Sequence, residues 1–308
     1  EQTIDPKIVA SEKRAVIRRS GALDFIEVDR SMGEVGGLGL FKDWAAKRSR
    51  AFTKEARDYK LPTPKGVLFL GPPGVGKSLV SKVLGSLWGL SVIRLDLGRV
   101  YGGLVGQSEA NINTAIKTAE AVAPCILWCD ELEKSVAGRS GEGDSGTSAR
   151  VFGTLLTWMT ERTSSVFVVA TANDIRALPP ELMRKGRFDE IFFVDLPGQE
   201  AREEIFRIHI AHYGRNPERF DLEALAMISE GYSGSEIEQA VVSAMYDAFD
   251  AGREVDADDV IRAIQETSPL SETMKEQIVY LREWAKNRAR PAALQEAVIL
   301  DASRVMDT

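Results

Sequence analysis

The feature that most constrains this chain is the run GPPGVGKS, from Gly71 to Ser78. It follows an apolar run, Val67–Leu70, and opens a helix-compatible segment, Lys77–Trp88, that has no interior proline. A glycine-rich loop in this context lets successive backbone amides point at phosphate oxygens, and the helix N-terminus adds positive potential. We expect Lys77 to reach the β and γ phosphates of a nucleotide and Ser78 to hold magnesium. The alternative is a glycine-rich turn that merely starts a helix.

Short runs rich in β-branched and aromatic residues recur along the first two thirds of the chain, with helix-compatible segments between them. This alternation predicts an α/β fold built on a five-stranded parallel sheet with helices on both faces. The strands are expected at Val67–Leu70, Val92–Leu95, Ile126–Cys129, Val166–Ala170 and Ile191–Val194. The helices between them are expected at Lys77–Trp88, Ser108–Val122 and Ala149–Glu161. The glycine- and serine-rich segment Gly138–Thr147 is expected to be a mobile loop.

From about Glu200 the strand patterns stop and helical patterns take over. The clearest helix follows GYSG, where Ser233 and Glu236 have the spacing of a capping box. Another helix is expected from Asp256. The predicted domains are an N-terminal helical lead-in (1–30), a nucleotide-binding α/β domain (31–198), a small all-α lid domain (199–268) and a C-terminal helical extension (269–308) that frays at its end.

Charge and cysteine content exclude several classes of protein. The net charge of -7 argues against a nonspecific nucleic-acid binder, which normally carries a basic domain. Two cysteines, Cys125 and Cys129, cannot build a disulfide framework or a four-ligand zinc site, so we expect small buried hydrophobes. No run approaches the roughly 18 apolar residues of a membrane span, and the start EQTIDPK is unlike a signal peptide. The first residue is not methionine, which is compatible with a fragment.

Polar residues follow two of the expected strands. Asp130 and Glu131 end the run CILWCDE, and Asn173 ends VVATAND. Ligands gather at the carboxyl ends of strands in open α/β sheets. We expect Asp130 to orient magnesium through its water shell, Glu131 to polarise an attacking water, and Asn173 to hydrogen-bond that water. The alternatives are a solvated acidic pair that caps the next helix and an asparagine in a turn.

These motifs, together with LMRKGRFDEIFFVDLP, occur in an order and spacing that resembles the AAA family of the AAA+ ATPases, over roughly Val35 to Thr267. The resemblance implies a P-loop NTPase fold, ATP and Mg²⁺ as ligands, and magnesium-dependent hydrolysis of ATP to ADP and phosphate. It also implies that Arg184 and Arg187 reach the ATP of a neighbouring subunit. Without this resemblance, the favoured interpretation of Arg184 and Arg187 would be two surface arginines paired with Glu181 or Asp189.

The same resemblance implies a set of nucleotide contacts. Val35 and Gly36 are expected to contact the base, His209 to face the adenosine, and Gly234 and Ser235 to close over it. By spacing alone, His209 is nearly as well explained by packing on a helix face. The expected contacts of the loop and the first helical turn are Pro73, Gly74, Val75, Gly76, Lys77, Ser78 and Leu79.

Family members that thread polypeptides usually display an aromatic residue, a hydrophobic residue and a glycine in the loop after the second strand. This chain has Leu104, Val105 and Gly106 there, so the predicted substrate loop lacks the aromatic ring. The loop is alternatively a contact between subunits, with Glu109 available to pair across the interface. Basic clusters at Lys47–Arg50 and Arg282–Arg290 are expected to be solvated faces.

The flanking segments resemble a subgroup of single-module AAA proteins encoded in cyanobacterial and plastid genomes. The leading hypothesis is a homo-oligomer, a hexamer in preference, as a closed ring or helical filament, that hydrolyses ATP to remodel a protein substrate. A nucleotide-gated scaffold that hydrolyses slowly and a DNA-associated factor are the alternatives. No nucleic-acid or membrane partner is expected. We expect the protein in the cytoplasm, and the plastid resemblance implies the plastid stroma as the alternative.

Overall fold

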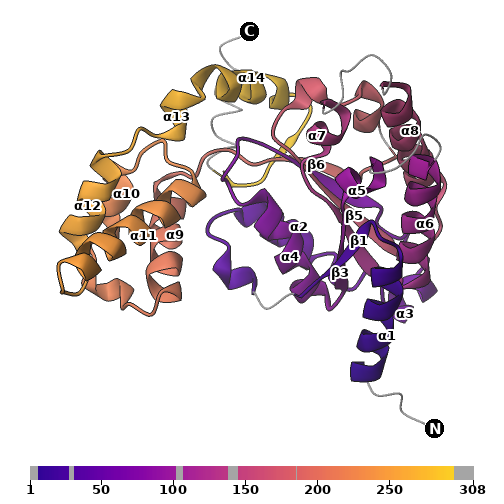
Figure 1. Ribbon diagram of the computed structural model, residues 1–308, viewed down its shortest axis with the longest axis horizontal. Helices are drawn as coiled ribbons and strands as arrows, with labels where there is room; N and C mark the ends of the chain where they lie inside the picture. The colour runs from indigo at the N-terminus through magenta and orange to yellow at the C-terminus, as the bar shows by residue number, and fades with distance from the viewer. Residues whose placement is uncertain (1–5, 28–30, 102–106, 138–144, 185, 295–308) are drawn as a thin grey trace. The chain divides into compact units, whose positions relative to one another are not determined.

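The computed structural model describes residues 6–27, 31–101, 107–137, 145–184 and 186–294 (Figure 1). The chain divides into two compact units. The first unit holds residues 1–30, 45–70 and 81–191, and the second holds residues 31–44, 71–80 and 192–308. None of the helices in the described ranges is long and apolar enough to cross a bilayer.

The sheet has seven strands in the order β1-β3-β4-β5-β2-β6-β7. β1 pairs antiparallel with β3, whereas the pairs β3–β4, β4–β5, β5–β2 and β6–β7 are parallel. The strands are β1 (Leu23–Ile26), β2 (Gly66–Leu70), β3 (Ser91–Leu95), β4 (Cys125–Cys129), β5 (Val166–Ala172), β6 (Glu190–Phe193) and β7 (Arg290–Pro291). The α/β fold and the five expected parallel strands are therefore confirmed, and β1 and β7 are additions.

The centre of the sheet is covered on both faces, because every residue of β2, β4 and β5 is buried. Continuous apolar runs of this kind are what parallel strands need, since each pleat faces a layer of packed side chains. Cys125 and Cys129 are two of these buried residues, as expected, and burial raises the pKa of both thiols to about 12. Both side chains therefore act as small hydrophobes.

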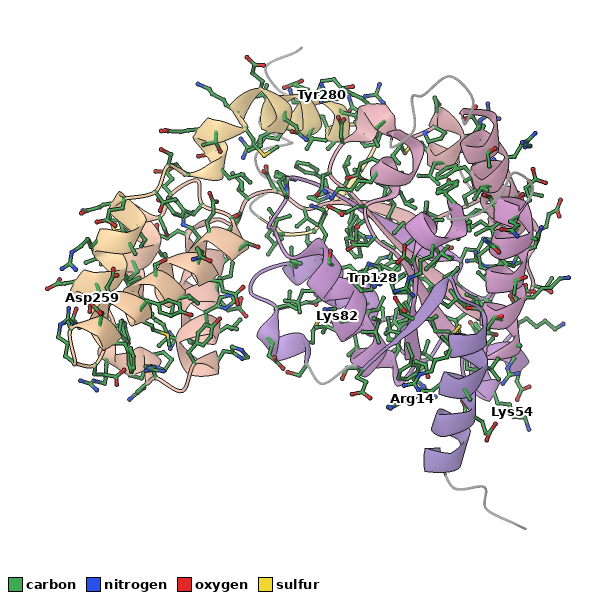
Figure 2. All side chains as sticks on the ribbon, in the orientation of Figure 1. Arg14, Lys54, Lys82, Trp128, Asp259 and Tyr280 are labelled. Atoms are coloured by element: carbon green, nitrogen blue, oxygen red, sulfur yellow. The ribbon has the colours of Figure 1, made fainter. Side chains whose placement is uncertain are left out.

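In the first unit, α6 and α8 pack against each other, α1 packs against β1 and α6, and α7 packs against α8 and β5. An edge-on aromatic contact of 4.8 Å between Trp88 and Phe167 fills the core. Lys82 lies over the ring of Trp128 at 5.7 Å (Figure 2). The helices assigned wholly to this unit are α1 (Pro6–Arg19), α3 (Lys54–Asp58), α5 (Leu97–Tyr101), α6 (Gln107–Ala121), α7 (Leu132–Ala137) and α8 (Ser145–Glu161).

The second unit contains a cluster of four helices that lie side by side (Figure 1). Their apolar faces form one core, which includes Phe206, Ile210, Ile237, Val241 and Val260. The four helices are α9 (Gln199–His212), α10 (Leu222–Ile228), α11 (Gly234–Asp250) and α12 (Ala257–Gln265). The predicted small all-α part of the fold is thus confirmed.

The helix starts in this cluster follow local chemistry. The Ser233 hydroxyl accepts a hydrogen bond from the Glu236 amide, and the Glu236 carboxylate accepts one from the Ser233 amide, so the predicted capping box is present. Asp256 caps α12 in the same way. On α12, which Figure 2 marks at Asp259, the buried carboxylate of Asp259 accepts hydrogen bonds of 2.5 and 2.6 Å from Arg253.

The remaining elements of the second unit surround β6. α2 (Gly39–Ala46) places Phe41 edge-on against Phe192 at 5.3 Å, and Trp44 contacts the same ring at 5.5 Å. After the four-helix cluster the chain forms α13 (Leu270–Thr273) and α14 (Lys275–Ala285) and then the short strand β7. The expected fraying is wrong for residues 290–292, because β7 pairs with β6 and Ala292 is fully buried.

The helix bounds agree closely with the expected ones: α4 is Lys77–Trp88, α6 is Gln107–Ala121 and α8 ends at Glu161. Part of the expected glycine-rich loop, residues 138–144, lies outside the described residues, and the rest of it begins α8 at Ser145.

Candidate nucleotide-binding site

The glycine loop lies in the second unit and follows β2 directly in the chain. Gly74 and Gly76 have φ angles of +77° and +90°, a left-handed backbone that side chains rarely adopt. At Gly71 a Cβ atom would lie 1.9 Å from the carbonyl oxygen of Val194, so no larger residue fits there. These three positions of the loop that leads into α4 therefore favour or require glycine.

Lys77 begins α4 and is 6% exposed. Its Nζ donates to the carbonyl oxygen of Gly71 at 2.9 Å and to that of Pro72. A phosphate group can replace these carbonyl contacts with stronger, charge-assisted ones. The lysine is thus fixed against the loop and suited to an anion. Ser78 and Leu79 follow it in the first turn and are half-buried, as is Pro73 in the loop.

A cavity of about 400 Å³ adjoins the loop within the second unit. Three of the residues predicted to contact the nucleotide line it: Gly36, Val75 and Gly234. Ser235 is not a lining residue, but its amide and hydroxyl both donate to the carbonyl oxygen of Gly74, at 3.0 and 3.3 Å. The start of α11 is therefore joined to the phosphate loop by hydrogen bonds.

Two other predicted contacts lie outside the cavity lining. Val35 is buried, and its carbonyl oxygen accepts a hydrogen bond from Lys42 Nζ. His209 is largely buried on α9, with its Nδ1 3.7 Å from Glu238 Oε1. One helical turn before His209, Ile205 does line the cavity. Ile205, which the sequence motifs did not single out, therefore lines the cavity, whereas His209 does not.

Glu204, another lining residue that the motifs did not single out, connects the first glycines to the helical cluster. Its Oε2 accepts a hydrogen bond of 2.6 Å from the Gly37 amide, and its Oε1 lies 3.6 Å from Lys42 Nζ. At Gly36 a Cβ atom would lie 2.6 Å from the Ile205 side chain. This close approach of backbone to α9 explains the glycine pair in the sequence EVGG.

The acidic pair lies in the first unit, where β4 and β5 end side by side. Asp130 and Glu131 directly follow β4, and both are joined to Thr171 on β5. The Thr171 hydroxyl accepts from the Glu131 amide at 2.9 Å and donates to Asp130 Oδ1 at 2.6 Å. Thr171 is 1% exposed, so this hydroxyl orients both acidic residues from within the core. The sequence motifs gave no signal of this role.

Asn173 lies beside Glu131, as predicted. Its Nδ2 donates to Glu131 Oε1 at 3.3 Å, while Glu131 Oε2 forms an ion pair of 2.7 Å with Lys134. The hydrogen bond to Glu131 raises the pKa of Lys134. Glu131 also has a φ of +49°, which is uncommon for a residue with a side chain.

Glu133 contacts the backbone of Asn173. It is 7% exposed, and its Oε1 accepts a hydrogen bond of 2.9 Å from the Asn173 amide. Its Oε2 is buried without a hydrogen-bond partner among the described residues. Burial, with a smaller contribution from the charge of Glu131, raises the pKa of Glu133. Glu133 therefore fixes the backbone of Asn173, a role that the sequence motifs did not indicate.

Arg184 and Arg187 lie before β6, also in the first unit. Arg184 is exposed at the end of a short 3-10 helix, and Arg187 is half-buried. Within the described ranges neither arginine forms an ion pair with Glu181 or Asp189, and Arg187 Nη1 has no hydrogen-bond partner. The Asp189 carboxylate instead accepts from the amides of Lys65 and Gly66.

The predicted substrate loop, Leu104, Val105 and Gly106, lies outside the described residues. Glu109, which was expected to be available for an interface, forms an ion pair of 2.8 Å with Arg150 on α8 of the same chain.

The oxygen donors of this chain fit a magnesium ion only if phosphate oxygens complete its coordination shell. Among the described residues no group of three or more His, Cys, Asp or Glu side chains could hold a metal ion. Magnesium usually takes one or two protein oxygens and completes its shell with waters and phosphate oxygens. The Ser78 hydroxyl and the Asp130 carboxylate are donors of that kind, so the donor set fits a magnesium ion that arrives with its nucleotide.

Comparisons with known proteins agree with these motifs. The model of the ATPase family associated with various cellular activities (AAA) matches residues 67–196, and a model of the AAA+ lid domain matches residues 219–263. The AAA domain-containing protein ycf46 of Pyropia yezoensis is 46% identical over 289 residues, 93% of this chain and 59% of that protein. A proteasome-activating nucleotidase of Aeropyrum pernix is 34% identical over 215 residues, 68% of this chain and 52% of that protein.

A cell division cycle protein 48 homolog of Archaeoglobus fulgidus is 33% identical over 215 residues, 67% of this chain and 28% of that protein. The chain spans about three fifths of the length of the ycf46 relatives that it matches. The similarity to the Pyropia yezoensis protein thus extends beyond both family models, into the flanking segments.

Proposed function

Because the chain belongs to the AAA family of ATPases, we propose that it binds ATP with Mg²⁺ and hydrolyses it to ADP and phosphate. In this proposal the loop amides and Lys77 bind the phosphates, and Ser78 and Asp130 hold the magnesium ion. Bound magnesium would neutralise charge on the phosphate oxygens. The buried position of Lys77 and the left-handed Gly74 and Gly76 support these roles.

The observation that carries the proposal of hydrolysis is the hydrogen bond from Asn173 Nδ2 to Glu131 Oε1. We assign Glu131 the role of polarising the attacking water and Asn173 that of orienting it. A carboxylate can accept a proton only if its oxygen is aimed at the water. The ion pair with Lys134 restricts the orientation of the Glu131 carboxylate, and the Thr171 hydroxyl holds the Glu131 backbone amide. The arrangement supports general-base chemistry.

The adenine base of the nucleotide is proposed to bind in the cavity lined by Gly36, Val75 and Gly234. Glycines on two sides let a flat ring approach the backbone closely. Ser235 holds the start of α11 to the phosphate loop through its two hydrogen bonds to the Gly74 carbonyl oxygen.

We further propose that the chain acts as a homo-oligomer in which Arg184 and Arg187 reach the ATP of a neighbouring subunit. The absence of ion pairs to Glu181 and Asp189 within the described ranges supports this role. A guanidinium at the transferred phosphoryl group accelerates transfer by roughly 10³ to 10⁵.

The work done with ATP is proposed to be remodelling of a protein partner, in the cytoplasm or the plastid stroma. A relative named as a proteasome-activating nucleotidase supports a protein rather than a nucleic-acid partner.

Hydrolysis is tested with Glu131→Gln, which keeps the size of the side chain but cannot take a proton. Purified wild-type protein, at concentrations where it assembles, should release phosphate from ATP only with Mg²⁺ present. Glu131→Gln should abolish release while ADP and ATP still bind. Phosphate release that is unchanged by the substitution would contradict the proposal, and assembly with ATP but no release would favour the scaffold.

Catalysis between subunits is tested with Arg187→Ala. This variant should bind ATP normally and lose hydrolysis, because the guanidinium acts on a neighbour. Mixing it with Glu131→Gln should restore part of the activity, since each variant supplies what the other lacks. Arg176→Ala is a matched control, because that arginine is exposed and paired with Asp174. If mixing restores nothing and Arg187→Ala keeps full activity, the arginine acts elsewhere.

A further inference from the structure

The segment after the helical cluster lies beyond residue 263, where the lid model ends. It is fixed to the second unit at two points. The first is Arg282 on α14, whose Nε and Nη2 donate to the Asp195 carboxylate at 2.6 and 3.0 Å. Asp195 is 6% exposed and follows β6 closely, so a bidentate ion pair to a buried carboxylate holds α14 at the end of that strand. Arg282, which was expected on a solvated face, is 37% exposed and is paired with Asp195.

The second point is the backbone around β7. Ala292 donates its amide to the carbonyl oxygen of Phe193 at 2.9 Å and accepts a hydrogen bond of 3.1 Å from the Phe41 amide. Ala292 is fully buried. The chain is therefore inserted between β6 and the start of α2, with both of its polar backbone groups paired. A segment held this way is a fixed part of the second unit and positions the residues that come next.

Those next residues, Ala293 and Leu294, line the same cavity as Gly36, Val75 and Gly234, and so does Arg282. Five apolar residues also line the cavity, beside the charged residues Lys42, Asp195, Glu200 and Glu204: Leu38, Leu196, Pro197, Ala201 and Ile205. A flat aromatic base suits a cavity with apolar walls and glycine backbone on two sides.

We propose that residues 282–294 form one wall of the subsite for the base of the nucleotide, with Ala293 in contact with the ring. This rests on the proposed function, which supplies the nucleotide, and adds a segment that neither family model includes. The small side chain of Ala293 is what leaves room for the ring. The phosphates bind to the glycine loop and do not depend on this wall.

The test is Ala293→Trp, in which the indole ring of the new side chain should occupy the cavity. ADP, titrated without metal as N-methylanthraniloyl-ADP, should bind at least about tenfold more weakly than to wild type, since each tenfold is about 1.4 kcal/mol of binding free energy. Inorganic pyrophosphate, which has no base, should bind both proteins equally in calorimetry. Ala289→Trp is the matched control, because Ala289 belongs to the same segment but does not line the cavity.

ADP affinity within about threefold of wild type in Ala293→Trp, with the control also unchanged, would overturn the proposal and leave the proposed function intact. Loss of both ADP and pyrophosphate would place the effect on the glycine loop and would also overturn it. Failure of wild type to bind either ligand would instead refute the proposed function. Ala293→Leu adds less volume and should show an intermediate loss of ADP affinity. If Ala293→Trp does not fold, an ADP affinity of Ala293→Leu equal to that of wild type would overturn the proposal that this segment forms a wall of the subsite.

Discussion

Thr171→Val is the most direct test of how the acidic pair is oriented. Valine has nearly the shape of threonine but lacks the hydroxyl that accepts from the Glu131 amide at 2.9 Å and donates to Asp130 Oδ1 at 2.6 Å. Because Thr171 is 1% exposed in a core of β-branched residues, packing should survive the change. The substitution therefore removes two hydrogen bonds and little else.

The loss of stability follows from those two contacts. A buried group left without its partner costs roughly 1–3 kcal/mol, more when the group is charged. Asp130 and Glu131 are half-buried, so water can replace part of what is lost. We expect the free energy of unfolding to fall by about 2 kcal/mol, which lowers the melting temperature by about 4–8 °C for a domain of this size.

Thr171→Val should reduce ATP hydrolysis much more than it reduces nucleotide affinity. ADP affinity should stay near wild type, because the glycine loop and the base cavity do not include Thr171. Phosphate release should fall about tenfold or more, since Asp130 and Glu131 are no longer oriented for magnesium and water. Melting is measured by scanning fluorimetry and turnover by phosphate release, with Thr171→Ser as the control that keeps the hydroxyl. Equal melting and equal turnover in the valine and serine variants would refute the reasoning.

Two further predictions concern stability. Gly71→Ala should largely prevent folding, because the added Cβ atom would lie 1.9 Å from the carbonyl oxygen of Val194. Gly153→Ala in α8 should instead raise the free energy of unfolding by about 0.5–1 kcal/mol, because no atom lies within 4 Å of the added Cβ. Similar melting temperatures for the two variants would contradict this. Arg253 lowers the pKa of Asp259 from 3.8 to about 2, so its ion pair stabilises the fold above about pH 4 and that contribution is lost as the pH falls towards 2. The melting temperature of wild type should therefore exceed that of Asp259→Asn at pH 6 by a margin that narrows between about pH 4 and pH 2, and a constant margin would show that Asp259 does not titrate in this range.

Local sequence chemistry predicted much of this protein. The loop needs glycine where φ is positive or a strand carbonyl lies close, and Gly71, Gly74 and Gly76 occupy those positions. The capping box at Ser233 and Glu236 needs only residues three apart. The apolar runs of β2, β4 and β5 show that these strands are buried on both faces, and the polar residues after β4 and β5 follow from strand direction. Such features depend on neighbours in the chain, so their pattern is visible in the sequence.

Other features exist only because distant segments meet. Thr171 looks like any β-branched strand residue until β4 and β5 pair and bring its hydroxyl to Asp130 and Glu131. The two-residue strand β7 has no periodicity of its own; it forms because β6 offers unpaired backbone groups that Ala292 can satisfy. Its neighbour Ala293 becomes a cavity residue by the same contact. The sequence by itself determined the phosphate loop and the class of fold, while tertiary hydrogen bonding, which must pair every buried amide and carbonyl, decided what surrounds them.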